Sequence, residues 1–297
     1  MSWSQADALR WVLDHPLNHG RRGRALSRWA MSQLLAHGMH RYRSVPFVDE
    51  TRLMIGPGLT NANMQHYVGI GELDVMGFLM HYLKPDMLFG DIGANVGVIS
   101  VLAAGAAGAK TVAFEPDPAN YAWLERNIAL NRLQDRVHLR PVAVSDTDGT
   151  LDLTRGQGAV NRAIAGGETG GRTVACSRLD TVFGGRALDV LKIDVEGYEL
   201  PVIRGAAGLL ASSRLSAVIL ELRGHGKRYG FDENEIRATM AAEGFRPMSY
   251  DPLSRRLAPV ENCPWRVRDE IYLRDPDAAA ERLRTAEPRR VIWGQRV

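Results

Sequence analysis

Cysteine is scarce in this sequence, with Cys176 and Cys263 as the two cysteines among 297 residues. Two cysteines are too few for a scaffold of disulfide bridges or for a zinc site made of four cysteines. Long apolar runs are also missing, because none approaches the roughly 18 residues that a transmembrane helix requires. The first residues carry acids and interrupt their apolar stretches early, unlike a signal peptide. We therefore expect a soluble, cytoplasmic protein without a membrane span.

Lysine is rare as well, with 4 lysines against 33 arginines. The net charge of +3 is unevenly distributed: residues 1–45 carry +5, residues 276–297 carry +2, and residues 46–275 carry −4. A basic terminus is compatible with binding to nucleic acid or to an anionic membrane surface. Because arginine is the general basic residue of this chain, a solvated helical face explains the N-terminal charge better than a contact surface does.

Apolar periodicity predicts two N-terminal helices, over residues 3–14 and 24–40. A strand-like segment at 51–56 and a helix at about 72–83 follow. From residue 87 onward, short apolar runs alternate with helical segments, which indicates βαβ units and a parallel sheet. The expected strands are 88–92, 111–115, 137–144, 189–195, 217–222, 245–250 and 270–274. The expected helices are about 96–106, 118–130, 198–211 and 233–243.

These elements divide the chain into four parts. They are an N-terminal helical extension at 1–45, a lead-in strand and helix at 46–85, one parallel-sheet domain at 86–275 and a C-terminal tail at 276–297. Within the domain, an insert at 149–180 contains two expected strands around a glycine-rich loop. The strands are 150–154 and 173–176, and the loop is 156–171.

A glycine-rich turn, Asp91–Gly97 with the sequence DIGANVG, joins the first expected strand of the domain to a helix. Glycines such as Gly93 and Gly97 let the backbone approach a ligand, and the N–H groups of the helix can hold a carboxylate. Tight packing alone also explains such a turn. The spacing is not that of a dinucleotide site, because Asn95 stands where the middle glycine of G-x-G-x-x-G would be. An NAD-dependent oxidoreductase is therefore disfavoured.

Acidic residues follow the next two expected strands. Glu115 ends the strand after the turn, where a carboxylate can accept two hydrogen bonds from the hydroxyls of a ribose. It is not needed as a helix N-cap, because Asp117 fills that role. Asp146 follows the third strand. It either accepts a bond from an adenine amino group or begins a turn with Asp148 and Gly149, and both readings stay open.

The segment Lys192–Gly197, KIDVEG, ends a strand with Asp194 and Glu196 at its carboxyl end, where open α/β sheets bind ligands. Strand alternation puts Lys192 and Asp194 on one face, while Ile193 packs on the other. A lysine inside an apolar strand is costly unless it is paired or functional. A salt bridge to one of these acids and a role in the reaction are both compatible with this pattern.

Six motifs together resemble the FkbM family of S-adenosylmethionine-dependent methyltransferases, in order and spacing, over about residues 88–222. They are DIGANVG at 91–97, FEP at 114–116, AVSD at 143–146, RLD at 178–180, KIDVEG at 192–197 and Glu221. KIDVEG is the most specific of them. The resemblance implies the α/β, Rossmann-like fold of class I methyltransferases. That fold has a seven-stranded, mostly parallel sheet with an antiparallel last strand and helices on both faces.

The resemblance also implies S-adenosylmethionine as the cofactor. Gly93, Asn95 and Gly97 would approach its methionine end, and Asp91 would help to bind its amino group. The acids after the second and third strands would hold the ribose and the adenine. The sulfonium of this methyl donor is cationic, which suits the net −4 of the central region.

Methyl transfer to oxygen requires an aligned acceptor and the removal of its proton. The candidate catalytic residues are Lys192, Asp194, Glu196, Glu221 and His225. The pair Asp194 and Glu196 is favoured for a direct role. His225 lies between two glycines, and it is displaced from the place where relatives often carry a histidine. The acidic pair could instead hold a divalent cation that orients a diol, but we do not favour a metal site.

The sequence therefore predicts an S-adenosylmethionine-dependent O-methyltransferase acting on a hydroxyl of a sugar, a polysaccharide or a natural product. One alternative is a nucleic-acid methyltransferase that uses the arginine-rich N-terminus. It is disfavoured because the chain lacks the Asn/Asp-Pro-Pro-aromatic strand end that base methylation often uses. Another is a non-catalytic module whose terminal helices serve assembly, for instance as a homodimer. Substrate specificity is expected to depend on residues 149–177, on residues 223–232 and on the N-terminal helices, if these cover the strand ends.

Overall fold

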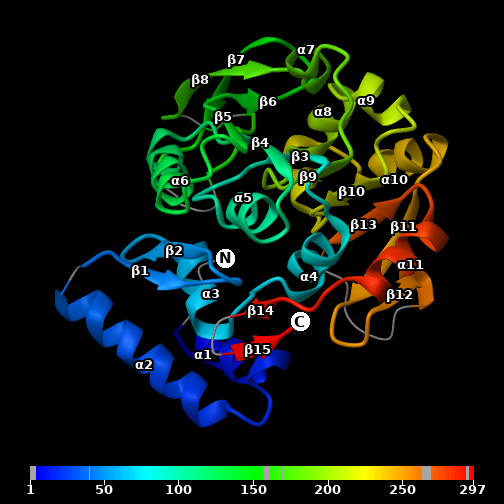
Figure 1. Ribbon diagram of the computed structural model, residues 1–297. Coiled ribbons are helices and arrows are strands. Elements are labelled where there is room, and N and C mark those ends of the chain that lie inside the picture. The colour runs from blue at the N-terminus through cyan, green and yellow to red at the C-terminus, as the bar shows by residue number, and fades with distance from the viewer. Residues whose placement is uncertain are drawn as a thin grey trace.

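A computed structural model describes residues 5–39, 41–156, 161–166, 168, 170–262, 269–291 and 294–297. Its centre is a sheet of eight strands (Figure 1). Their order is β12 (Arg256–Pro259), β11 (Arg246–Asp251), β13 (Glu270–Leu273), β10 (Ala217–Leu220), β9 (Val190–Ile193), β3 (Leu88–Ile92), β4 (Lys110–Phe114) and β5 (Val137–Arg140). No helix among the described residues is long and apolar enough to cross a membrane.

The pairing of these strands confirms the Rossmann-like α/β fold. Strands β10, β9, β3, β4 and β5 pair in parallel. Strand β13 runs antiparallel between β10 and β11, as expected for the last strand of the fold. The seven expected strands are therefore all present. Strand β12, which the sequence pattern did not reveal, adds an eighth strand at the edge by pairing antiparallel with β11.

Helices cover both faces of the sheet, as expected. Neighbouring strand residues point to opposite sides, so that Val190 joins one apolar cluster and Leu191 joins the other. The side of Leu191 is covered by α7 (Leu179–Phe183), α8 (Glu199–Arg204), α9 (Ala207–Ala211) and α10 (Glu233–Ala242). The side of Val190 is covered by α4 (Leu73–Tyr82), α5 (Val98–Val101), the π-helical turn Leu102–Ala106, α6 (Pro118–Leu130) and α11 (Pro276–Thr285).

The lead-in segment and the C-terminal segment share one core with the sheet. The lead-in consists of β1 (Arg43–Pro46), β2 (Arg52–Ile55), α3 (Thr60–Val68) and α4, and the C-terminal segment of α11, β14 (Arg290–Val291) and β15 (Gln295–Arg296). Phe47 and Leu53 lie in the same apolar cluster as Phe89 of β3, and so do Leu283 and Val297. The segment expected to be a tail is thus folded and packed. The division of the chain into these four parts stays a prediction.

The N-terminal helices α1 (Gln5–Asp14) and α2 (Arg22–Met39) form a hairpin beside α3, β1 and β2 (Figure 1). Val12, Ala25 and Val68 make a small apolar cluster of their own between α1, α2 and α3. Arg10 and Arg22 are exposed. An exposed basic face of this kind agrees with the solvated helical face expected from the sequence.

The segment 137–144, expected to be one strand, is divided into two. Strand β5 belongs to the large sheet, whereas β6 (Ala143–Val144) pairs with β8 in a three-stranded sheet. Pro141 lies between them and has no N–H to donate to a ladder.

Strands β7 (Gly149–Leu153) and β8 (Arg172–Ser177) confirm the two strands of the insert. Cys176 on β8 is a buried free thiol, whereas Cys263 and residues 157–160, 167 and 169 of the loop lie outside the described residues.

Candidate active site

The predicted site residues gather at the carboxyl ends of four neighbouring strands. Asp91 lies near the end of β3, Glu115 directly follows β4, and Glu221 directly follows β10. Asp194 directly follows β9, between β3 and β10. Because these four strands are parallel, their carboxyl ends form one edge of the sheet. Ligands of open α/β sheets bind at this edge.

The glycine-rich turn closes tightly over this edge. Gly93 adopts a φ of +81°, and a Cβ atom there would collide with the carbonyl oxygen of Asp194. Asn95 has a φ of +51°, and its backbone N–H donates to Glu115 Oε2 at 2.8 Å. Gly97, with a φ of +87°, precedes α5 and would meet the side chain of Leu124 if it carried a Cβ. The turn therefore requires glycine for close packing as well as for backbone conformation.

Replacing Gly93 with alanine is expected to destabilise the fold more than the same change at Gly58. Both glycines have left-handed backbones, with φ of +81° and +78°, which costs an alanine about 1–2 kcal/mol. No atom lies within 4 Å of the place of a Cβ at Gly58, whereas at Gly93 the backbone of Asp194 must move. Urea unfolding of the two variants measures the difference. Equal losses of stability would contradict the requirement for close packing at Gly93.

Glu115 is 6% exposed and is held by the backbone on both sides. Its Oε2 accepts the N–H of Asn95, and its Oε1 accepts the N–H of Asp117, each at 2.8 Å. Burial raises the pKa of Glu115 to about 7, although these hydrogen bonds oppose the rise. The side chain of Asn120 also donates to this carboxylate, which has about four lone-pair sites in all. Asp117 is the N-cap of α6, as expected, because its side chain accepts two N–H groups of the first turn.

Asp146 is half-buried after β6 and accepts a hydrogen bond from Ser145 Oγ at 3.2 Å. Asp148 holds the insert instead, because its carboxylate accepts bonds from Ser177 Oγ, the Arg178 N–H and Thr181 Oγ1. Because Asp148 makes the contacts that hold the insert, Asp146 is not needed for the turn, which favours a ligand-binding role for Asp146. That role stays a prediction.

Lys192 is 5% exposed, and its Nζ lies 2.8 Å from Asp194 Oδ2, so the salt bridge considered from the sequence is present. Asp91 lies opposite Lys192 in the register of β3 and β9. Burial alone would lower the pKa of Lys192, but Asp194, Asp91 and Glu72 together raise it. Lys192 therefore keeps its charge inside the protein and stabilises the ionised form of Asp194, whose pKa is lowered.

Three charged residues of the site had no signal in the sequence. Glu72 precedes α4, Asp269 precedes β13, and Arg223 follows β10. Arg223 bridges Glu221 at 2.5 Å and Asp269 at 3.2 Å. Burial raises the pKa of Glu72 to about 7 and that of Asp269 to about 6, with neighbouring acids contributing in both cases. This corner of the described structure thus holds a surplus of acidic groups over cations, which suits a cationic ligand.

Glu196 and His225 meet at the same edge, although His225 comes from a separate loop. Glu196 Oε2 lies 3.3 Å from His225 Nδ1. Burial, together with Asp194, raises the pKa of Glu196. Burial and the nearby Arg228 lower the pKa of His225, so its imidazole is neutral near pH 7. The structure thus brings His225 to the acidic group despite its displacement in the sequence.

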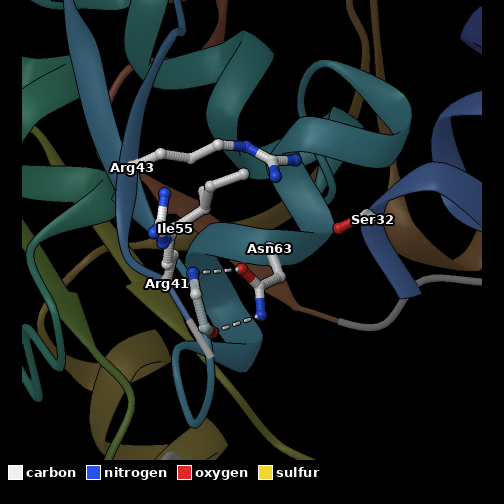
Figure 2. Close-up of a pocket in the computed structure, with 6 residues that line it drawn as sticks. Ser32, Arg41, Arg43, Ile55 and Asn63 are labelled. Carbon is white, nitrogen blue, oxygen red and sulfur yellow. Dashed lines mark hydrogen bonds between the residues drawn. The ribbon is translucent and has the colours of Figure 1, made fainter. Parts of the chain in front are cut away.

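A small cavity of about 10 Å³ lies elsewhere, beside the N-terminal hairpin (Figure 2). Figure 2 shows the side chain of Asn63 bonded to both backbone groups of Gly56, at 3.0 and 2.9 Å. Arg41 and Arg43 also line this cavity. It has room for about one water molecule, so it is too small for a nucleotide-sized cofactor.

Comparison with known proteins identifies the family. Residues 91–247, more than half of the chain, match the family model described as the methyltransferase FkbM domain. The chain belongs to the FkbM methyltransferase family. Within this FkbM-family chain the matched segment contains every residue that the sequence assigned to the site. Glu72 and Asp269, which complete the charged corner, lie outside it.

Two curated relatives are methyltransferases. The chain is 27% identical to the hexuronic acid methyltransferase AglP of Haloferax volcanii, over 51% of this chain and 62% of the relative. It is 30% identical to the methyltransferase sdnD of Sordaria araneosa, over 39% of this chain and 58% of the relative. The chain thus spans about three fifths of the length of these relatives. A solved methyltransferase FkbM from Methylobacillus flagellatus is 11% identical, with a TM-score of 0.46, over 84% of this chain and 60% of that one.

Proposed function

We propose that this chain transfers the methyl group of S-adenosylmethionine to a hydroxyl oxygen of a sugar or sugar-containing acceptor. The observation that carries the proposal is the convergence of the family's acidic residues at one edge of the sheet, beside the glycine-rich turn. Such a site suits a cationic methyl donor that also presents an amino group and a ribose.

The residues at this edge fit that cofactor. Asp91 is fully buried, and its Oδ1 has no hydrogen-bond partner within the described structure, so it can accept a bond from the amino group. Its other oxygen accepts from Ser100 Oγ at 2.6 Å, which orients the carboxylate. Glu115 offers lone pairs to both ribose hydroxyls, and Asp146 offers an acceptor to the adenine. When bound, the cofactor supplies an electrophilic methyl group on a positively charged sulfur.

The residues of the chain align the acceptor and take up its proton. The acceptor oxygen must lie about 3 Å from the methyl carbon, in line with the bond that breaks. Asp194 is ionised because of Lys192, and a quarter of its side chain is exposed, so it can accept a hydrogen bond from an acceptor hydroxyl. Glu196, Glu221 and His225 form the group at which that hydroxyl loses its proton.

A sugar is favoured as the acceptor by the name of one relative, which is a hexuronic acid methyltransferase. Tyr198, Tyr229 and Phe231 also lie in mutual contact near the site, with ring centroids 5.4 to 6.0 Å apart. Aromatic side chains commonly line pockets for small molecules. Two of these three rings belong to the segment 223–232, where the sequence predicted substrate specificity. A nucleic acid is less favoured, because the arginine-rich hairpin packs on α3 rather than on the strands of the site.

The proposal is tested by incubating the purified chain with methyl-tritiated S-adenosylmethionine and a panel of acceptors. We expect transfer to uronic acid-containing oligosaccharides and a product stable to base, as an ether is. RNA and DNA serve as the competing arm of the panel. Labelling of nucleic acid, with salt-dependent retention of the chain on it, would support the alternative function. An absence of transfer to every acceptor would favour a non-catalytic module.

Replacing Glu115 with alanine is expected to raise the dissociation constant of S-adenosylmethionine at least about tenfold. Two hydrogen bonds to a charged carboxylate are lost, and each such bond contributes about 1.5–3 kcal/mol. Isothermal titration measures the change. Glu125→Ala on the exposed side of α6 is the matched control, and its affinity is expected to be that of the original chain. Unchanged affinity in Glu115→Ala would remove the ribose assignment.

A further inference from the structure

Three side chains at the active-site edge present ligand atoms to one another. One carboxylate oxygen each from Glu196 and Glu221, and one ring nitrogen of His225, all lie within 4.8 Å of one another. Among the described residues this is the one group of three or more such side chains with this spacing. The three come from the loop after β9, the end of β10 and the 3-10 helix His225–Tyr229.

A second observation concerns Glu221 alone. Glu221 is 8% exposed, and its Oε2 is buried without a hydrogen-bond partner in the described part of the chain. Its Oε1 is already bound to Arg223. Burial, together with the neighbouring Asp194 with which it shares a hydrogen bond, raises the pKa of Glu221 to about 11. The two carboxyl groups therefore hold one proton between them, and a cation at this place would replace that proton.

We propose that Glu196, Glu221 and His225 bind one divalent cation of the Mn²⁺ and Mg²⁺ class. Opposite oxygens around an octahedral Mg²⁺ lie about 4 Å apart, because each bond measures about 2.0–2.1 Å. Neighbouring ligand atoms around such an ion lie about 2.9 Å apart. The three ligand atoms, which lie within 4.8 Å of one another, therefore have to move closer together when the ion binds. Carboxylate oxygens suit Mg²⁺ and Mn²⁺, and the imidazole favours the transition metal, so Mn²⁺ is the better match.

Hydrogen bonds and close packing fix the loop that carries Glu196 beside His225. The Glu199 carboxylate accepts the N–H groups of Val195 and Gly197, at 3.2 and 3.0 Å. Glu196 itself adopts a left-handed backbone, with a φ of +57°. Gly197 packs so closely on the backbone of His225 that a Cβ there would collide with it. The backbones that carry two of the three ligands are therefore fixed against each other.

A cation at this place would hold an acceptor hydroxyl and lower its pKa. The hydroxyl proton then passes to the Asp194 carboxylate, the O–CH₃ bond forms, and the S–CH₃ bond breaks to leave a neutral sulfide. No oxidant or reductant is needed. This role rests on the proposed methyl transfer to oxygen, whereas the binding of the cation does not depend on it.

The test is a titration of the purified full chain with MnCl₂, in which the electron paramagnetic resonance signal of free Mn²⁺ is followed. We expect one Mn²⁺ per chain, displaced by excess MgCl₂. The variants His225→Ala and Glu196→Gln are each expected to weaken Mn²⁺ binding at least tenfold. His138→Ala, an exposed histidine on β5, is the matched control and should bind Mn²⁺ as the original chain does.

The absence of Mn²⁺ binding, or equal binding in the control and in both site variants, would overturn the cation site. Isothermal titration of the same samples with S-adenosylmethionine keeps the two proposals apart. If the unsubstituted chain does not bind S-adenosylmethionine, the proposed function is contradicted, whatever the Mn²⁺ result. Cofactor binding without Mn²⁺ binding contradicts only the cation site. Because Glu196→Gln keeps the shape of the side chain, it remains informative if His225→Ala folds poorly.

Discussion

Replacing Lys192 with methionine is expected to lower the free energy of unfolding by about 3–5 kcal/mol at neutral pH. Methionine preserves most of the volume of the side chain, so the loss has an electrostatic origin. Lys192 is buried, it binds Asp194 at 2.8 Å, and Asp91 and Glu72 also raise its pKa. Without it, these carboxyl groups lose the buried cation that compensates their charge.

The loss is expected to depend on pH in a defined direction. In the variant, the pKa values of Asp91 and Asp194 in the folded state rise above their unfolded value, near 4. Below that pH the carboxyls are protonated in both states and need no cation. Stability therefore falls as the pH rises from about 4 to 7. Urea unfolding at several pH values measures this dependence.

Two further variants isolate the charge. Lys110→Met removes an exposed lysine at the start of β4, two strands away from β9, and is expected to change stability by less than about 0.5 kcal/mol. The double variant Lys192→Met, Asp194→Asn removes both charges of the pair. It is expected to be more stable than Lys192→Met alone, because one uncompensated carboxylate is gone. A double variant that shows the sum of the two single losses would contradict the pairing.

The positions of the site residues that lie on a strand or directly after one could be predicted from the sequence. Lys192 and Asp194 were expected on one face because side chains alternate along a strand, and they form a salt bridge. Asp91 and Glu115 were expected in one cofactor site because of the family resemblance, and the parallel strands β3 and β4 end at the same edge. The order of the strands, with β9 between β3 and β10, was not predicted, because no local pattern in the sequence encodes it.

Glu72 and Asp269 could not be predicted, because each lies at the end of an element that the fold brings in from a distant part of the chain. Glu72 stands before α4 and Asp269 before β13, and neither belongs to a motif. Their proximity depends on the antiparallel insertion of β13 and on α4 covering the sheet. The division of 137–144 did have a signal, since Pro141 interrupts it, but its apolar run outweighed the proline.

Replacing Asp194 with asparagine is expected to lower kcat by about 10²–10⁴-fold, the usual range for a group that assists proton transfer. The amide has the shape of the carboxylate but no charge, so the hydrogen bond that it accepts from an acceptor hydroxyl is weakened. The affinity for S-adenosylmethionine is expected to change less than about threefold, because the groups assigned to the cofactor are Asp91, Glu115 and Asp146.

The matched control is Asp189→Asn, just before the other end of β9. Asp189 is also buried and ion-paired, with Arg214 at 2.8 Å, and its Oδ2 accepts the N–H of Leu88. It lies at the amino end of the strand, so its loss is expected to reduce stability and to leave kcat within about twofold. Single-turnover rates with labelled donor separate the two variants. A similar fall of kcat in both would assign the effect to the strand rather than to the carboxylate. A fully active Asp194→Asn would place the transfer step away from the end of β9.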